Sequence, residues 1–311
     1  MKNNIEKLFV DNKKIKTQKG QEKILCGVSI ADPEALNNYV RGRFLNLHQI
    51  MEIAVFDFRV NVIRLPVHPY GIDDQPGWIS NPESYLKNHL DKAINKSIEL
   101  DIYVIIDLHL ICDYTSDEIN KLVTSFWTQI APIYSDYPNV IYELFNEPLY
   151  PDDWNKWKEI AQPWIDLIRK YAPDTLLLVG GPRWCQNMSG AAKNPFSGKN
   201  IVYSAHCYPD HLRDFNKNWG DLVDKYPVFF TEWGYENPGK TPWQGTTSGF
   251  GEPFMKIINE KKLSWCAWCF DSDWPPRIFD RKWQLFEDKE NYMSFFTKEL
   301  LKEARSKGEN I

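Results

Sequence analysis

Two glutamates stand where apolar, strand-like runs of this chain end. The run VIYELF (140–145) is followed by Asn146, Glu147 and Pro148, and the run VFFT (228–231) is followed by Glu232. A proline disfavours helix at the residue before it and cannot donate to a strand ladder. We therefore expect the first strand to stop here, with Asn146 and Glu147 at its carboxyl end. Barrels of parallel strands keep their chemistry at this end of the strands, so both glutamates are candidate catalytic groups.

Two carboxylates on one rim suit the cleavage of a glycosidic bond. One carboxyl group protonates the departing oxygen, and the other attacks the sugar or activates water. Other run ends would bring supporting side chains to the same rim, although they come from distant parts of the sequence: Arg64, His109, Asn146, His206, Tyr208 and Trp268. An arginine would keep its neighbouring carboxylate ionised, and repulsion between the two carboxylates would raise the pKa of the acid.

Eight apolar segments would have to position these residues. They begin at Ile24, Asn61, Ile102, Asn139, Thr175, Ile201, Val228 and Leu263. Helical or helix-sized segments separate them, and we expect helices at about 45–58, 83–100, 116–134, 152–171, 251–262 and 289–306. Alternation at this period implies parallel strands joined by crossovers. We predict an α/β fold, a (β/α)8 TIM barrel whose long βα loops form the substrate cleft, in one catalytic domain over 1–311 with a polar leader at 1–23.

The composition of the chain argues against two classes of binding partner, nucleic acids and membranes. The chain has 311 residues, a net charge of −5 and no long basic run, which argues against a nucleic-acid partner. No apolar run is long enough to span a membrane, so we expect no membrane partner. The Lys- and Asn-rich start lacks an apolar signal region, so we expect a cytoplasmic protein, or a secreted one if a leader has been lost. We expect a monomer that needs no cofactor.

A metal site is not expected. Asp107 and His109 could form a ligand pair, but no further ligands follow at a suitable spacing. Cys266 and Cys269 have CxxC spacing within a predicted strand, so their thiols would point to opposite faces. We interpret all six cysteines as reduced packing residues. Glu143 lies on the same face of its strand as Glu147 and reads as a structural carboxylate beneath it.

Aromatic residues make up 14% of the chain, and many of its thirteen tryptophans lie in predicted loops. Flat apolar rings in an open cleft suit stacking on sugar rings. Trp184, Trp233 and Trp274 could each be such a platform or simply pack within a loop. His68, which follows the second predicted strand, is a possible further sugar contact.

In order and spacing, the motifs of this chain resemble those of glycoside hydrolase family 5, the cellulase and mannanase family of retaining (β/α)8 glycosidases. The resemblance covers about residues 24–300 and rests on NVIRLP at 61–66, DLH at 107–109, YPNVIYELFNEP at 137–148, HCY at 206–208, TEWG at 231–234 and WCAW at 265–268. Any one of these motifs alone would be only suggestive.

The resemblance implies a role for each matching residue. Glu147 would be the general acid/base and Glu232 the nucleophile, with Asn146 binding the 2-hydroxyl of the sugar at the cleaved bond. Arg64 and Tyr208 would orient Glu232 and keep it charged. The remaining residues would complete the site, with His206 beside Glu147, His109 lining the sugar subsite and Trp268 beneath the sugar.

The implied activity is that of an endo-acting β-1,4-glucanase working by double displacement on a β-linked polysaccharide or oligosaccharide. Mannan, mixed-linkage glucan and xyloglucan stay open as substrates. Two hypotheses of other classes also remain, an inactive carbohydrate-binding barrel and a metal-dependent barrel hydrolase. Turnover of an aryl β-cellobioside would exclude the first, and activity that survives a chelator would exclude the second.

Overall fold

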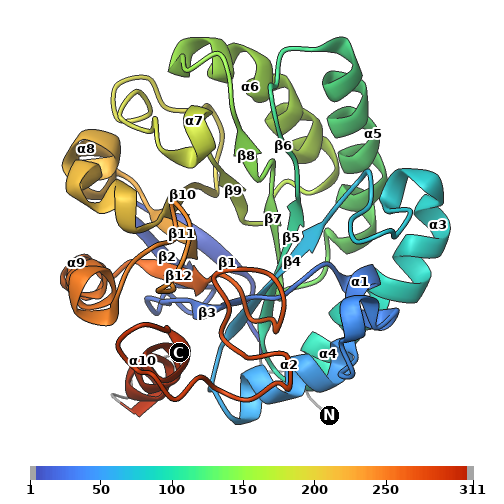
Figure 1. Ribbon diagram of the computed structural model, residues 1–311. Helices are drawn as coiled ribbons and strands as arrows, with labels where there is room; N and C mark the ends of the chain where they lie inside the picture. Colours follow the sequence, from blue (N-terminus) through green and yellow to red (C-terminus); the bar gives the residue numbers. More distant parts are fainter. Residues whose placement is uncertain (1–4, 307–311) are drawn as a thin grey trace.

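The computed structural model describes residues 5–306, and its centre is a closed barrel of parallel strands (Figure 1). Around the barrel the order is β3-β4-β5-β7-β9-β10-β11-β12, and β12 pairs with β3 to close it. The strands are β3 Cys26–Ser29, β4 Val62–Val67, β5 Tyr103–Leu108, β7 Val140–Glu143, β9 Leu177–Val179, β10 Ile201–Cys207, β11 Val228–Trp233 and β12 Ser264–Ala267. Each begins within two residues of its predicted start, and the TIM barrel is confirmed.

Helices surround the barrel on the outside (Figure 1). Two of them begin with side-chain caps. Ser116 accepts from the N–H of Ile119 at the start of α5 (Asp117–Tyr134), and Asn46 forms a capping box with Gln49 at the start of α2 (Leu47–Phe56). The helical segments are α1 Pro33–Asn37, η1 Val40–Gly42, α2 Leu47–Phe56, η2 Trp78–Ser80, α3 Pro82–Tyr85, η3 Leu86–Leu90, α4 Asp91–Glu99, α5 Asp117–Tyr134, α6 Trp154–Tyr171, α7 Pro182–Cys185, η4 Pro209–Asp214, η5 Asn216–Gly220, α8 Asp221–Lys225, η6 Thr247–Gly251, α9 Glu252–Lys261 and α10 Ser294–Ser306.

The last helix begins later than predicted, at Ser294 instead of 289. The Asp288 carboxylate accepts hydrogen bonds from the backbone N–H groups of Glu290 and Asn291. This local turn competes with helix, as Asp side chains commonly do. The hydroxyl of Ser294 donates to the carbonyl of Ile278 at 2.5 Å and so ties the true helix start to the preceding loop.

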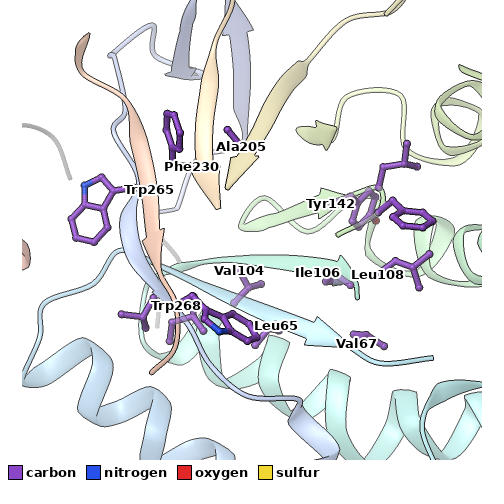
Figure 2. Close-up of a cluster of buried hydrophobic side chains, with 14 of the residues drawn as sticks. Leu65, Val67, Val104, Ile106, Leu108, Tyr142, Ala205, Phe230, Trp265 and Trp268 are labelled. Atoms are coloured by element: carbon purple, nitrogen blue, oxygen red, sulfur yellow. The ribbon is translucent and has the colours of Figure 1, made fainter. Parts of the chain in front are cut away.

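Alternation along the strands divides the apolar residues into two layers. Outward-facing side chains pack beneath the helices, and Figure 2 shows part of this cluster, including Leu65, Val104 and Ile106. A second cluster contains the alternate residues, among them Val62, Ile105, Ile141, Leu178, Val202 and Phe229. Because side chains alternate between the two faces of a strand, this second cluster fills the barrel interior.

The same alternation places polar side chains above the apolar interior. Arg64 follows Val62 by two positions, Asp107 follows Ile105, Glu143 follows Ile141, and Ser204 follows Val202. All four polar residues are completely buried. The upper half of the barrel interior is therefore charged and polar, directly below the rim where the strands end.

An N-terminal hairpin closes the other end of the barrel. Strands β1 (Leu8–Asp11) and β2 (Lys14–Thr17) pair antiparallel, and Leu8 and Ile15 belong to the interior apolar cluster. The hydroxyl of Tyr103 donates to the carbonyl of Glu6 at 2.8 Å. Residues 1–23 were predicted to be a polar leader, but Leu8 and Ile15 in this segment belong to the core.

The strand that carries Asn146 and Glu147 differs from the prediction. Its barrel portion, β7, ends at Glu143, and Glu147 and Pro148 form a separate short strand, β8, which pairs with β6 (Ile111–Cys112). The N–H of Leu144 donates to Leu178 on one side, whereas the N–H of Asn146 donates to Leu108 on the other. The chain thus changes hydrogen-bonding partner, which breaks the strand before the proline is reached.

The six cysteines form no disulfide within residues 5–306. Cys266 lies in the interior cluster and Cys269 in the outer one, so these two point to opposite sides as expected. Within residues 5–306, no helix has both the length and the apolar character needed to cross a bilayer.

Candidate active site

Arg64 is the central cation of the site at the carboxyl ends of the strands. Its fully buried guanidinium donates to Glu232 Oε1 at 2.7 Å, to Glu143 Oε2 at 2.6 Å and to Asn146 Oδ1 at 2.6 Å. It also contacts Asp107 Oδ2 at 2.9 Å. A planar guanidinium carries five donors in a fixed arrangement, so this one side chain sets the relative positions of residues from three other parts of the barrel.

Glu232, at the end of β11, is held in its charged form. Its second oxygen, Oε2, accepts from the hydroxyl of Tyr208 at 2.7 Å and lies 3.6 Å from His206 Nδ1. Burial alone would raise the pKa of this carboxyl, but the charges of His206 and Arg64 and the Tyr208 hydrogen bond lower its pKa to about 2. Glu232 is therefore an ionised, oriented carboxylate over the whole ordinary pH range.

Glu147 has the opposite electrostatic environment. Burial raises the pKa of its carboxyl and the negative charge of Glu232 adds to that effect, although the hydrogen bond with His206 opposes it. His206 Nδ1 lies 2.7 Å from Glu147 Oε1, and its Nε2 lies 3.1 Å from the hydroxyl of Thr231. One oxygen of Glu147 and one of Glu232 lie within 4.8 Å of each other. The two carboxyls thus face the same small space with pKa values displaced in opposite directions.

Glu143 and Asp107 lie beneath this pair and support it. Glu143 Oε1 accepts from the hydroxyls of Ser204 at 2.6 Å and Thr231 at 2.8 Å, while its other oxygen binds Arg64. Asp107 Oδ2 lies 2.6 Å from His109 Nδ1 as well as contacting Arg64. Glu143 therefore has the structural position expected from the sequence, and Asp107 orients His109.

Asn146, His109 and Trp268 complete the floor around the carboxylates. The Nδ2 atom of Asn146 is buried and has no hydrogen-bond partner among the described residues, so it can donate to a bound molecule. The rings of His109 and Trp268 are nearly parallel, at 9° with centroids 5.5 Å apart. Burial lowers the pKa of His109 well below its usual value, so this imidazole is neutral.

The site opens into a cleft of about 560 Å³. His109, Asn146, Glu147, Tyr208, Glu232 and Trp268 all line it, together with Trp184 from the loop after β9. Other lining residues were not candidates from the sequence: Ile111, Arg183, Gln186, His211, Thr241 and Pro242. Trp243 also lines the cleft, and it is one of the loop tryptophans whose rings were expected to suit stacking on sugars.

The structure places the other possible sugar contacts predicted from the sequence in the cleft, in the core or beside the cleft. Trp184 lines the cleft, with its ring edge against Tyr150. Trp233 is completely buried against Phe254 and Trp265, so packing is its role. His68 and Trp274 do not line the cleft, but the His68 ring contacts His109 and the Trp274 ring contacts Trp268, both of which line it. Sequence alone could not separate these cases because all three tryptophans follow strands or lie in loops.

Glu147, His206 and Glu232 also place three possible metal-ligand atoms within 4.8 Å of one another, the one such group found in residues 5–306. The Arg64 guanidinium and the Tyr208 hydroxyl already bind the two oxygens of Glu232. A positive charge 2.7 Å from one of these ligands disfavours a further cation by direct repulsion. The donor set therefore fits hydrogen bonding better than metal binding, and we propose no metal site.

Sequence comparison places this site in a known family. A model of the cellulase family, glycosyl hydrolase family 5, matches residues 32–273, which include every residue of the site described above. The chain belongs to glycosyl hydrolase family 5. The resemblance inferred from its motifs is therefore confirmed.

Individual relatives agree with this assignment. An endoglucanase of Clostridium saccharobutylicum is 32% identical over 219 residues, covering 67% of this chain and 46% of the relative. Endoglucanase N of Pectobacterium atrosepticum is 28% identical over 271 residues, covering 84% of this chain and 56% of the relative. This chain thus spans about half the length of the curated relatives that it matches.

Among solved structures, a β-glucanase of Saccharophagus degradans is 29% identical, with a TM-score of 0.85. The match covers 97% of this chain and 94% of that one. The same β-glucanase has also been solved in complex with cellotetraose. The described fold therefore has a close structural counterpart in a protein named a β-glucanase.

Proposed function

We propose that this protein is a retaining endo-β-glycosidase that hydrolyses β-1,4-linked glucan by double displacement. The observation that carries the proposal is the pair formed by Glu147 and Glu232. Their nearest oxygens lie within 4.8 Å, and their pKa values are displaced in opposite directions. Retaining glycosidases place their carboxyl groups about 5–5.5 Å apart and inverting ones about 6.5–9.5 Å apart. The short separation favours the retaining mechanism.

In the first step, Glu232 attacks the anomeric carbon, and a covalent glycosyl-enzyme forms as the bond to the leaving oxygen breaks. The carboxylate is ready for attack because Arg64 and Tyr208 keep it charged and aimed. Glu147 gives its proton to the leaving oxygen, so the departing sugar leaves as a neutral alcohol. The raised pKa of Glu147 is what allows it to hold that proton at working pH.

In the second step, Glu147 acts as a base. Having lost its proton, it accepts one from a water molecule that attacks the anomeric carbon, and the bond to Glu232 breaks with net retention of configuration. The ring nitrogen Nδ1 of His206 lies 2.7 Å from Glu147 Oε1, so His206 can stabilise the negative charge that Glu147 carries after it has lost its proton. The pKa of the His206 imidazole depends on the charges of both Glu147 and Glu232. Burial lowers that pKa, but the negative charges of Glu232 and Glu147 raise it overall.

A β-1,4-glucan is the preferred substrate because the relatives found are named endoglucanases and a β-glucanase, one of them solved with cellotetraose. The β-glucanase relative also supports a second candidate, a mixed-linkage glucan. Mannan and xyloglucan are the remaining alternatives. An inactive binding barrel is disfavoured because both carboxylates and their supporting residues are in place.

The test is hydrolysis of a panel of soluble polysaccharides, with the products sized by chromatography. We expect carboxymethyl cellulose or mixed-linkage β-glucan to fall rapidly in viscosity, with products of several sizes and retained β-configuration by proton NMR at early times. Preferential cleavage of mannan would overturn the choice of sugar. An α-configured first product would overturn the retaining mechanism.

A further inference from the structure

Strand β11 contains a bulge at Thr231, directly before Glu232. In the register with β10, Glu232 pairs with His206, and Phe230 pairs with the residue directly before it. Thr231 is therefore an extra residue without a partner in β10. A bulge interrupts the alternation of side chains between the two faces of a strand and redirects them. Because Phe230 and Trp233 both belong to the outer apolar cluster, the two residues between them point into the barrel interior.

The hydroxyl of Thr231 belongs to a buried group of three oxygens. It lies 2.8 Å from Glu143 Oε1, and the hydroxyl of Ser204 lies 2.6 Å from both of these oxygens. Glu143 accepts here, since Arg64 donates to its other oxygen and opposes the effect of burial on its pKa. If the Thr231 hydrogen turned toward His206, one hydrogen would be left for three close oxygens. The hydrogen therefore stays within this group, and the Thr231 oxygen presents a lone pair to His206.

The imidazole of His206 connects Thr231 to Glu147. Its Nε2 lies 3.1 Å from the Thr231 oxygen, and its Nδ1 lies 2.7 Å from Glu147 Oε1. Hydroxyl–imidazole–carboxylate triads that act as nucleophiles have the same connectivity. Thr231 is completely buried, however, and its hydrogen points toward Glu143 and Ser204, so it does not act as a nucleophile. What it offers His206 is a hydrogen-bond acceptor.

Charged groups from several strands surround His206. Burial lowers the pKa of its imidazole, but the negative charges of Glu232 and Glu147 raise this pKa overall. Arg64 opposes the two carboxylates. Four further titratable groups lie close enough to interact with the imidazole: Asp107, Glu143, His109 and His211. Of all these groups, Glu143 is the one that also contacts the Thr231 hydroxyl, so a test of Thr231 needs a control for Glu143.

Glu147 and His206 hold their protons as a pair, across the 2.7 Å contact. When Glu147 is ready to act as the acid, the pair carries two protons. One lies between Glu147 Oε1 and His206 Nδ1, and the other lies on Nε2, whichever group holds the first. After one proton is lost, the remaining proton stays beside the Glu147 carboxylate, and Nε2 is bare. An acceptor at Nε2 therefore stabilises the two-proton state and gives nothing to the one-proton state.

We propose that Thr231 is a positioning residue for the acid step, because its hydroxyl oxygen accepts from His206 Nε2 and so keeps the second proton on the pair formed by Glu147 and His206. The inference rests on the proposed glycosidase function and deepens it. Thr231 extends the pH range in which Glu147 can protonate a sugar leaving group. The bulge in β11 is what places this hydroxyl beside His206 while Glu232 keeps its position at the rim.

The test follows kcat/KM for cellotetraose between about pH 5 and 10, because this ratio reports ionisations of the free enzyme. A sugar leaving group needs the acid, so activity falls at high pH as the pair loses its proton. Thr231→Val removes the hydroxyl and should move this fall to lower pH by about half a unit to one unit, the effect of one neutral hydrogen bond. Thr231→Ser keeps the hydroxyl and should retain the wild-type value. Thr231→Val and wild type should have the same profile on 2,4-dinitrophenyl β-cellobioside, which needs little acid.

Ser204→Ala is the control for Glu143, because Ser204 donates to the same Glu143 oxygen and has no hydrogen bond to His206 within residues 5–306. Its fall in activity should stay at the wild-type pH. An unchanged pH in Thr231→Val, or an equal shift in Ser204→Ala, would overturn the inference. A wild-type protein that hydrolyses neither substrate would instead overturn the proposed function. Thermal unfolding shows whether each variant is folded, and Thr231→Ala, which puts no extra methyl group against Glu143, replaces Thr231→Val if that variant does not fold.

Discussion

The hydroxyl of Tyr208 offers a direct test of how the site holds its nucleophile. It donates to Glu232 Oε2 at 2.7 Å, and both residues are buried. Tyr208→Phe removes this one donor and leaves the ring in place. Because the hydrogen bond favours the charged carboxylate, its loss favours protonation, so the pKa of Glu232 must rise from its value of about 2.

The size of the rise follows from the energy of the bond. A hydrogen bond to a charged group contributes about 1.5–3 kcal/mol, and one pKa unit corresponds to about 1.36 kcal/mol. The pKa of Glu232 should therefore increase by about one to two units, to about 3–4. Activity requires the ionised nucleophile, so it should be lost as the pH falls through this new value. The wild-type enzyme should keep its charged nucleophile well below that pH.

The assay is kcat/KM for 2,4-dinitrophenyl β-cellobioside between about pH 2.5 and 7, because this ratio reports ionisations of the free enzyme. The activated leaving group reduces any contribution from Glu147. Tyr203→Phe is the matched control. It removes a buried hydroxyl from β10, the strand that ends just before Tyr208, and this hydroxyl accepts from the N–H of Phe196 and does not contact Glu232. Activity recovered after return to neutral pH excludes acid unfolding. An acid limb at the same pH in Tyr208→Phe and wild type would refute the reasoning.

Three further predictions test other parts of the structure. Glu232→Ala should abolish turnover, and azide should partly rescue it by forming a glycosyl azide of inverted configuration; normal activity in this variant would show that another residue is the nucleophile. Glu147→Gln should lose far more activity on polysaccharide than on a 2,4-dinitrophenyl glycoside, because only the poorer leaving group needs the acid, and equal losses on the two would argue against that role. Leu8→Ala, at the closed end of the barrel, should lower the free energy of unfolding by about 2–5 kcal/mol in a urea titration. Its kcat/KM should not change while the protein is folded, and a fall under those conditions would mean that the hairpin influences the site.

The residues on the rim were predictable because each one directly follows, or ends, an apolar run that is visible in the sequence. An apolar run that ends in a polar residue fixes the strand, its direction and the side chain at its end. Arg64, His109, His206 and Glu232 were assigned on this basis, and the structure brings them together around one centre. The closed barrel followed from eight such units, since alternation of strand and helix leaves few other topologies.

Features that depend on contacts between distant segments were not predictable. The break between β7 and β8 arises because backbone N–H groups of residues 144–147 change their hydrogen-bond acceptors from β9 to the end of β5 and the residues after it. The core role of Leu8 and Ile15 depends on an opening at the end of a barrel that forms far away in sequence. The local sequence pattern of these residues indicates neither the strand break nor the burial of the hairpin.

The sequence by itself determined the strands, their order and the identity of the two glutamates. The family resemblance also implied that Arg64 and Tyr208 contact Glu232 and that His206 contacts Glu147. Only the tertiary structure decided how closely these groups lie and how deeply they are buried. It also decided that Trp184 faces the cleft, that Trp233 is core, and that His68 and Trp274 contact residues that line the cleft. Local patterns specify where a strand ends, whereas the pKa of a carboxyl and the exposure of a ring are set by neighbours that only the closed barrel brings together.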